Sequence, residues 1–565
     1  MASPIDDRIG KLIAAFSRDG YTVDRNSDVI QCGEKIGMRA THTTAVIGTT
    51  GRKKKVYYLE GDPHTMGYLQ GRLAESEIER MCTEFNHNIV FDFISDKIHD
   101  PVLRELLGEV LTDIIYLISK NIYQDIPPIY IEELEGMLDG CKEVHSKTNV
   151  SRENLWVLNV GIDAILSYVY TGLFPHKKLF PLEIKAEHLR IPIMCNGFSA
   201  TGVDSRIQSR FHFLGRDFMF PNAGVYQDTA SMIIRKPDTG IPTVSVAAPG
   251  MIGTIAGVNM NRVGAGVDMT PASNCTSQRP GFNSLLLTRH SIQNGKNCDE
   301  AIDIIVKAHR GVSWNYLLAD GTTDKACVLE AGRSIDALNV LAYADQWVID
   351  AMKAIDPKIE DLVKNPFSPL HNGCMVRWST YAYPAVYQKF NQGLMEAFKK
   401  INPGYSYTYD PEDFNRTGFI DKKWTDRNCP GPFYFTPQRE DMPGMLLVTN
   451  HYITPEMRFC AMNLWTAIIA SGNTDDLQWR YDELNSQLIT VLEKGYMTGE
   501  EAQSIIDFLS PKGNYPDYYN PEKQSLDSLQ IQGSVSLVDL KKRIITSHYG
   551  YYSDEWIAIS LGNYV

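Results

Sequence analysis

The spacing of apolar residues changes at Cys195, and this change constrains the fold more than any other feature. Before it, apolar residues recur every three to four positions over residues 103–120, 130–144 and 154–168, as is typical of helices that cover a core. After it, short apolar runs alternate with turn residues, which indicates strands and hairpins. The sequence therefore predicts an α+β fold in which a mainly helical segment precedes a sheet-rich region.

The sheet-rich region contains three hairpin signals, and the third joins residues 316–319 to residues 326–330 through an Asp-Gly turn. Residues 231–235 and 243–247 flank a Pro-Asp-Thr-Gly turn, and residues 255–260 and 266–269 flank an Asn-Arg-Val-Gly turn. The other expected elements are strands over 56–61, 211–220, 316–319, 326–330, 445–448 and 555–561, and helices over 64–73, 284–293, 299–309, 475–494 and 500–509. Strands with helices on both sides predict a layered αββα sandwich.

The chain has 565 residues, which is too long for one ordinary core. We expect an N-terminal extension over residues 1–55, which show little periodicity, then a mainly helical pro-segment over residues 56–194. Residues 195–565 form the expected catalytic region. Within it, residues 345–444 are rich in Pro, Asn, Asp and aromatic side chains, which favours an inserted segment or lid.

Composition excludes several classes of function. The net charge of -13 argues against a surface for nucleic-acid phosphates, and the basic run 52–55 is expected to be a solvated turn. We find no run of about eighteen apolar residues and no secretory signal, so we expect no membrane span and a cytoplasmic location. The ten cysteines form no CxxC pair, which argues against zinc ribbons and redox motifs; no metal and no cofactor are expected.

Cys195 is the candidate nucleophile. If its sulfur attacks the carbonyl carbon of Met194, the chain breaks there and an α-amine is freed on Cys195 itself. Such an amine has a pKa of about 7.7–8.0, which suits it to take the thiol proton near neutral pH. One residue would then supply both nucleophile and base. A buried structural cysteine is the alternative that the isolated residue leaves open.

Arg216 and Asp217 belong to a strand that is expected to return beside Cys195. A fixed guanidinium near a thiol lowers the pKa of the thiol, and Asp217 can accept a hydrogen bond from the α-ammonium group. An ordinary ion pair on the surface of the strand is the alternative for these two residues.

Asn450 follows the predicted strand 445–448, where an amide can donate to a developing oxyanion. A turn residue bonded to its own backbone is the alternative. The adjacent His451 ranks below Asn450, because the α-amine already supplies a base. Asp268, at the end of the second hairpin, can orient the α-amine or contact substrate, or be a simple turn aspartate. Arg289 fits a role in packing or in an ion pair.

Together these segments resemble the C45 peptidase family of N-terminal nucleophile (Ntn) hydrolases, whose best-known member is acyl-coenzyme A:6-aminopenicillanic acid acyltransferase. The choloylglycine hydrolases are a more distant likeness. No single segment is specific, but their order is. The similar segments are residues 59–61 with 66–71, 195–202, 215–218, 249–253 with 257–259, 318–320 with 329–330, and 449–451.

The resemblance implies an αββα fold, self-cleavage before Cys195, and an acyl group taken from a linear amide as a thioester on Cys195. It also implies that Asn450 is a donor in the oxyanion hole. Arg216 matches the family's Gly-Arg-Asn or Gly-Gln-Asn segment. The family's aspartate that holds the α-amine is replaced here by Met219, so Asp217 would have to substitute for it.

Asp268 falls where relatives often have an asparagine that contributes to the oxyanion hole. A carboxylate at that place repels an oxyanion unless it is protonated or turned away. Cys195 is followed by Asn196, where Thr or Ser is more usual in the family.

We therefore expect a self-processing amidohydrolase or acyltransferase that acts on an N-acylated small molecule. Its N-terminal 194 residues are expected to stay bound after cleavage, and a homo-oligomer is left open. One alternative is a phospholipase-B-like hydrolase of lipid esters, which an apolar channel lined by residues 345–444 would favour. The other is a non-catalytic binding protein that kept the fold, an alternative left open by Met219 and Asp268.

Overall fold

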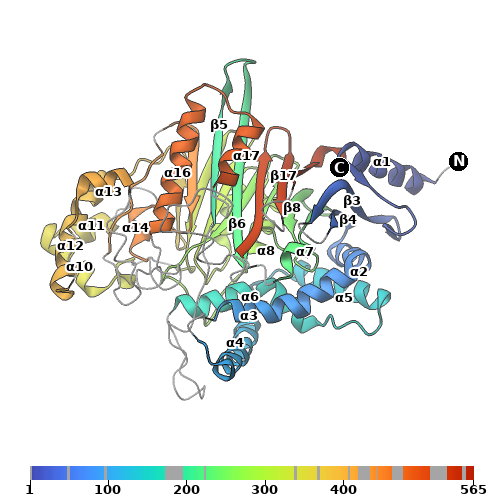
Figure 1. Cartoon of the computed structure of the whole chain (residues 1–565), viewed down its shortest axis with the longest axis horizontal. Coiled ribbons are helices and arrows are strands. Elements are labelled where there is room, and N and C mark those ends of the chain that lie inside the picture. Colours follow the sequence, from blue (N-terminus) through green and yellow to red (C-terminus); the bar gives the residue numbers. More distant parts are fainter. Residues whose placement is uncertain are drawn as a thin grey trace.

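Two β-sheets form the centre of the structure, a computed structural model of the chain (Figure 1). The described residues are 3–47, 51–94, 98–171, 195–221, 224–335, 340–364, 370–404, 408–417, 433–440, 442–460, 475–508, 531–549 and 555–565. Among them, no helix combines the length and the apolar character needed to cross a bilayer.

The larger sheet has twelve strands and takes residues from both sides of Cys195. Its strands are β1 (Tyr21–Thr22), β2 (Val29–Cys32), β3 (Lys35–Ile47), β4 (Arg52–Gly61), β7 (Ser231–Pro237), β8 (Thr243–Ala247), β9 (Ala256–Asn259), β10 (Val263–Met269), β11 (Trp314–Asp320), β12 (Lys325–Ala331), β13 (Leu370–His371) and β14 (Cys374–Trp378). Their order is β1-β3-β4-β7-β8-β9-β10-β11-β12-β14-β13, with β2 paired to β3. The pairing of β4 with β7 is parallel, so the N-terminal segment is built into the sheet.

The smaller sheet has six strands, and it begins directly after Cys195. Its strands are β5 (Asn196–Asp204), β6 (Ser209–Pro221), β15 (Met445–Thr449), β16 (Ile531–Asp539), β17 (Ile544–Tyr549) and β18 (Ile557–Ser560). Their order is β15-β5-β6-β16-β17-β18. This order places β5, which follows Cys195, between β6 and β15, which carry Arg216 and lead to Asn450.

Helices cover both sheets and fill the N-terminal part. They are α1 (Pro4–Arg18), α2 (Pro63–Arg80), α3 (Asn86–Asp92), α4 (Pro101–Ile122), α5 (Pro128–Val144), α6 (Arg152–Tyr170), α7 (Tyr226–Thr229), α8 (Ser284–Asn294), α9 (Cys298–Lys307), α10 (Gln346–Ile355), α11 (Ile359–Lys364), α12 (Lys389–Ile401), α13 (Pro411–Thr417), α14 (Pro455–Arg458), α16 (Asp475–Leu492) and α17 (Gly499–Phe508). A π-helical turn, Met81–Phe85, joins α2 to α3.

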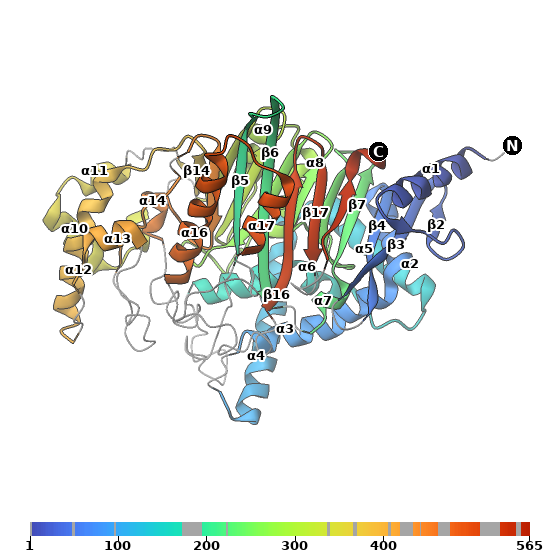
Figure 2. The ribbon, with the colours of Figure 1, turned by 45° about the horizontal axis from the view of Figure 1, so that its top comes forward.

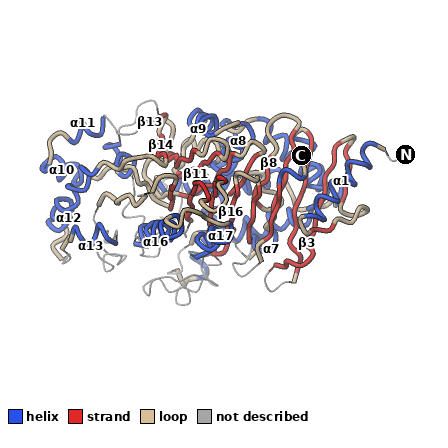
Figure 3. The backbone as a smooth tube through the Cα atoms, turned by 90° about the horizontal axis from the view of Figure 1, so that it is seen from above, coloured by secondary structure: helices blue, strands red, loops and turns tan. Residues whose placement is uncertain are grey.

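The helices lie on the two sides of the paired sheets (Figure 3). Helices α8 and α9 contact β9 to β12 of the larger sheet, and α16 and α17 contact β5, β6, β15 and β16 of the smaller one (Figure 2). One core cluster lies under α16 and α17 and contains Phe198, Leu447 and Leu484. A larger cluster joins the facing sheets to the N-terminal helices and contains Cys195, Leu214 and Phe218. Cys195 therefore lies in the core that the two parts of the chain share.

Helices α2 and α5 pack backbone to backbone through glycines. A β-carbon on Gly67 would lie 1.9 Å from the carbonyl oxygen of Glu133, and one on Gly136 would lie 2.0 Å from that of His64. Such distances exclude any side chain at these positions. The glycine spacing in the segment 66–71 thus reflects a tight helix pair that supports the N-terminal part of the large sheet.

The expected α+β class and the three hairpins are confirmed, as are the helices expected over 103–120, 130–144 and 154–168. The prediction of a solvated turn for the basic run 52–55 is wrong, because these residues begin strand β4. Lys54 is fully buried, and its amine donates to the carbonyl oxygen of Tyr549 at 3.0 Å. The first fifty residues, which showed little periodicity, contain α1 and strands β1 to β3. The proposed division into extension, pro-segment and catalytic region remains a prediction.

Candidate active site around Cys195

The strand pair β5–β6 positions the first two candidate residues. Side chains alternate along a strand, so Arg216 and Asp217 point to opposite faces of β6. Arg216 points toward the larger sheet, where Gly266 of β10 faces it, and a β-carbon on Gly266 would lie 2.8 Å from Arg216 Cδ. The absence of a side chain at Gly266 therefore leaves the space that the buried guanidinium group occupies.

Cys195 is fully buried, and both its backbone N–H and its carbonyl oxygen form hydrogen bonds with side chains. Its N–H donates to Asn450 Oδ1 at 2.7 Å, and its carbonyl oxygen accepts a hydrogen bond from Arg480. Arg480 also donates to Asn450 Oδ1 at 3.2 Å, and Asn450 Nδ2 donates to the carbonyl oxygen of Met269 at 2.7 Å. The thiol donates to the carbonyl oxygen of Met219 at 3.5 Å. The backbone nitrogen that would become the α-amine thus faces a side-chain acceptor.

Arg216 and Asp268 form a fully buried pair beside Cys195. Arg216 Nη1 lies 3.5 Å from Asp268 Oδ1, and it donates to the carbonyl oxygens of Asn196, at 3.1 Å, and Asp217. Arg216 Nε and Nη2 and both carboxylate oxygens of Asp268 have no hydrogen-bond partner among the described residues. Buried polar groups are nearly always paired in native proteins, so these groups are available to a ligand or to water.

Burial and neighbouring charges set the protonation of the Cys195 thiol and the Asp268 carboxyl group. Burial raises the pKa of the Cys195 thiol, Arg216 lowers it, and the carboxylate of Asp268 raises it further. Burial also raises the pKa of Asp268 to about 6, against the opposing effect of Arg216 and Arg480. The thiol is therefore held protonated near neutral pH in the uncleaved chain, and it needs a base before it can act as a nucleophile.

Asp217 lies on the other face of β6, beside Asn196, its partner in register. Burial raises its pKa well above the usual range, and the charge of Asp507 in α17 raises it further. The expected role of Asp217 as holder of the α-amine is not favoured by this placement, because Cys195 N–H is directed at Asn450 instead.

Hydrogen bonds from a residue of β11 hold the segment that carries Asn450. Asn315 Nδ2 donates to the carbonyl oxygens of Thr449 and His451, each at 3.0 Å. His451 Nδ1 lies 2.6 Å from Thr449 Oγ1, its Nε2 lies 3.3 Å from Gln478 Oε1, and burial lowers its pKa to about 3. His451 is thus a neutral residue bonded to its neighbours, which agrees with its rank below Asn450.

The structure therefore brings together four of the five predicted residues: Cys195, Arg216, Asp268 and Asn450. The sequence pattern does not predict the roles of Arg480 and Asn315 in this site. Arg480 lies in an ordinary polar helix pattern, and only its complete burial distinguishes it. The expected ion-pair role of Arg289 is confirmed, because its Nη2 lies 2.7 Å from Glu133 Oε2.

One group among the described residues has the composition of a metal site, and it lies on α2 and at the end of α5. Ligand atoms of Glu75, Glu79 and His145 lie within 4.8 Å of one another. Glu79 already accepts hydrogen bonds from Asn149 at 2.6 Å and from Thr148 at 3.1 Å. These bonds give the carboxylate an ordinary structural role in the loop that follows α5.

Comparison with known proteins gives distant similarities. No family model matches the chain. An uncharacterised protein from Archaeoglobus fulgidus is 26% identical over 512 residues, and the match covers 90% of this chain and 66% of that protein. The chain thus spans about two thirds of that relative's length. Two solved structures of variants of conjugated bile acid hydrolase from Clostridium perfringens match with TM-scores of 0.31 and 0.26. Their identities are 9% and 10%, and the matches cover 65% and 66% of this chain and 92% and 88% of theirs.

Proposed function

We propose that this chain is a self-processing cysteine Ntn hydrolase with a four-layer αββα sandwich. It hydrolyses a linear amide, or transfers the acyl group, through an acyl thioester on Cys195. The proposal rests on the polar groups that surround Cys195. Its N–H is directed at Asn450 Oδ1, and the unpartnered polar groups of Arg216 and Asp268 lie beside its thiol.

Maturation begins with attack of Cys195 Sγ on the carbonyl carbon of Met194, which lies outside the described residues. A C–S bond forms and the C–N bond breaks, so that the acyl group moves to sulfur and the nitrogen of Cys195 takes up a proton. Water then hydrolyses the thioester, which restores the thiol and leaves a carboxylate on Met194. Because burial raises the thiol pKa, this first step is slow until the proton of the thiol finds an acceptor.

Turnover uses the amine that maturation frees. The amine takes the thiol proton, and the thiolate attacks the carbonyl carbon of the substrate amide. Asn450 Oδ1 holds the amine as it now holds the N–H, and the second N–H of Asn450 Nδ2 donates to the oxyanion. Arg216 stabilises the thiolate by its fixed charge. The amine of the substrate leaves after it takes up a proton, and water or an acceptor amine then cleaves the acyl thioester on Cys195.

Intact mass spectrometry of the purified, denatured chain tests the proposal. We expect two chains of about 22 and 42 kDa, in proportion to residues 1–194 and 195–565 of the 63.6 kDa total. The larger chain should begin at Cys195. The Cys195→Ala variant should remain at 63.6 kDa and inactive.

The matched control replaces a buried cysteine of α5, Cys141→Ala, which should cleave like the unaltered chain. Fragments from Cys195→Ala would exclude self-processing by this thiol. An uncleaved chain whose Cys195 resists alkylation would instead support the binding-protein alternative.

A further inference from the structure

The outward face of α4 carries a concentration of exposed apolar side chains. Among the described residues, eleven large hydrophobic side chains are exposed, and five of them lie between residues 102 and 123. They are Val102, Leu106, Tyr116, Leu117 and Tyr123. The helix projects from the rest of the molecule (Figure 2), so another molecule can reach this face. Such a patch on a projecting helix marks an interaction surface.

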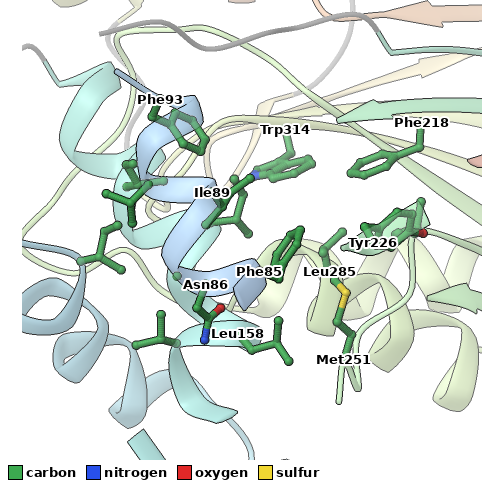
Figure 4. A pocket seen from close by; sticks show the side chains of 17 residues that line it. Phe85, Asn86, Ile89, Phe93, Leu158, Phe218, Tyr226, Met251, Leu285 and Trp314 are labelled. Carbon is green, nitrogen blue, oxygen red and sulfur yellow. The ribbon is translucent and has the colours of Figure 1, made fainter. Parts of the chain in front are cut away.

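The inner face of α4 is used within the chain. Leu107, Leu111 and Ile114 are buried there. Ile115 is one of the side chains around the apolar pocket between the N-terminal helices and the sheets (Figure 4). The packing that holds α4 in place is thus provided by its inner face, and the outer face is left for a partner.

The outer face has the residue spacing of a coiled-coil seam. Exposed residues recur after three and four positions alternately, which brings them into one stripe along the helix. The stripe consists of Leu106, Glu109, Asp113, Tyr116, Lys120 and Tyr123. Among the described residues no ion pair involves its three charged side chains, and the amine of Lys120 lies 4.1 Å from the centre of the Tyr116 ring. Its charges are therefore available to a partner.

The two halves of the stripe complement each other when two such helices run in opposite directions. In an antiparallel pair centred between residues 114 and 115, Leu106 meets Tyr123, Glu109 meets Lys120, and Asp113 meets Tyr116. The Tyr116 hydroxyl can donate to the Asp113 carboxylate, and a two-fold axis repeats each of these contacts. A parallel pair would instead place Glu109 against Glu109 and Asp113 against Asp113, which repel each other.

We propose that α4 pairs with α4 of a second copy of this chain, antiparallel and about a two-fold axis. A lipid surface fits this face less well. It would draw Glu109 and Asp113 toward the bilayer, where carboxylates are costly, and the net charge of -13 opposes anionic lipids. The interface contains none of the candidate active-site residues, so it does not depend on the proposed function.

Sedimentation equilibrium of the purified chain tests the pairing. We expect a dimer of twice the 63.6 kDa mass of one copy. Lys120→Glu should weaken association by about tenfold or more, because it places two carboxylates in each layer that holds Glu109. Glu109→Lys should do the same through two ammonium groups. The double variant exchanges the two charges and should restore the dimer.

The matched control is Lys142→Glu, which reverses the charge of an exposed lysine on α5 and should leave the dimer unchanged. Cross-linking by a carbodiimide gives a second measurement, since it joins a carboxylate only to an amine in contact with it. Glu109 and Lys120 of one helix are about 16 Å apart along its axis, so a cross-linked peptide that contains both must come from two copies.

Three outcomes would overturn the proposal. The first is a monomer at all concentrations, and the second is a dimer that the charge reversals do not weaken. The third is a monomer that floats with vesicles of phosphatidylcholine and phosphatidylglycerol, which would assign the outer face of α4 to a lipid surface. Circular dichroism of each variant establishes that loss of the dimer does not come from loss of the fold.

Discussion

Two buried arginine–carboxylate pairs in this molecule differ in how completely they are satisfied. Arg377 of β14 and Glu330 of β12 are 3.2 Å apart, and the carboxylate also accepts hydrogen bonds from Ile453 and Thr454, the shortest at 2.6 Å. Arg216 and Asp268 are 3.5 Å apart, and two nitrogens of Arg216 and both oxygens of Asp268 lack partners among the described residues.

The difference separates charges that hold the fold from charges that are available for chemistry. A buried ion pair is tolerated when further hydrogen bonds satisfy its remaining groups, as around Glu330. An incompletely satisfied pair costs stability, and it persists where function needs the groups. On this comparison we interpret the Arg377 pair as structural, and we propose that the Arg216 pair beside Cys195 belongs to the active site.

The largest expected effect on stability comes from Glu330→Gln. The amide cannot accept all the hydrogen bonds that the carboxylate accepts, and the change removes one of the two carboxylate charges that Arg377 contacts, the other being that of Glu440. Breaking such a buried pair typically costs about 3–5 kcal/mol of unfolding free energy. Urea denaturation followed by circular dichroism measures the change. A cost below about 1 kcal/mol would show that hydrogen-bond satisfaction does not distinguish the two pairs.

Asn450→Ala should have the next largest effect, on turnover. Losing an oxyanion donor lowers kcat by about 100- to 1000-fold, and substrate binding should change much less. Asn450→Asp separates the two roles of the side chain, since it keeps an acceptor for the α-amine and loses the donor. Equal losses in both variants support the donor role, whereas near-normal turnover in Asn450→Asp would reduce Asn450 to a holder of the amine. Steady-state kinetics on an N-acyl amide decide between them.

Some site residues can be predicted from local pattern and order alone, and others cannot. Cys195, Arg216 and Asn450 are predicted from segments whose order in the sequence resembles that of the C45 peptidase family. Strand neighbours point to opposite faces, so a position of Arg216 beside the thiol also predicts that the side chain of Asp217 points away from it. The contact of Arg480 with Cys195 joins residues far apart in the chain, and no local period encodes it.

The fold shows the same limit. The hairpins after Cys195 are local, and their turn residues predict them. The parallel pairing of β4 with β7 is not local, so the basic run 52–55 looks like a turn while Lys54 is buried against Tyr549. Glycine is required at positions 67 and 136 because backbone atoms of the opposite helix lie too close for a side chain, and the local sequence does not encode this contact.

Asp268→Asn should have the smallest effect and test the comparison most directly. The pKa of Asp268 is about 6 in the folded chain and about 3.8 in the unfolded chain. Between these two pH values the carboxyl group is therefore protonated in the folded chain and ionised in the unfolded chain. The stability that this carboxyl contributes is complete below about pH 3.8 and is lost as pH rises through about 6. The total loss is about 3 kcal/mol, at 1.4 kcal/mol for each pKa unit.

Asparagine does not titrate, so the variant escapes this loss and should gain stability relative to the unaltered chain as pH rises from about 4 to 6. Urea denaturation at a series of pH values measures the gain. Above pH 6 the variant should also alkylate faster at Cys195, because the carboxylate that raises the thiol pKa is gone. If both quantities are independent of pH, Asp268 is already paired in solution, and the contrast with Glu330 would no longer mark the site.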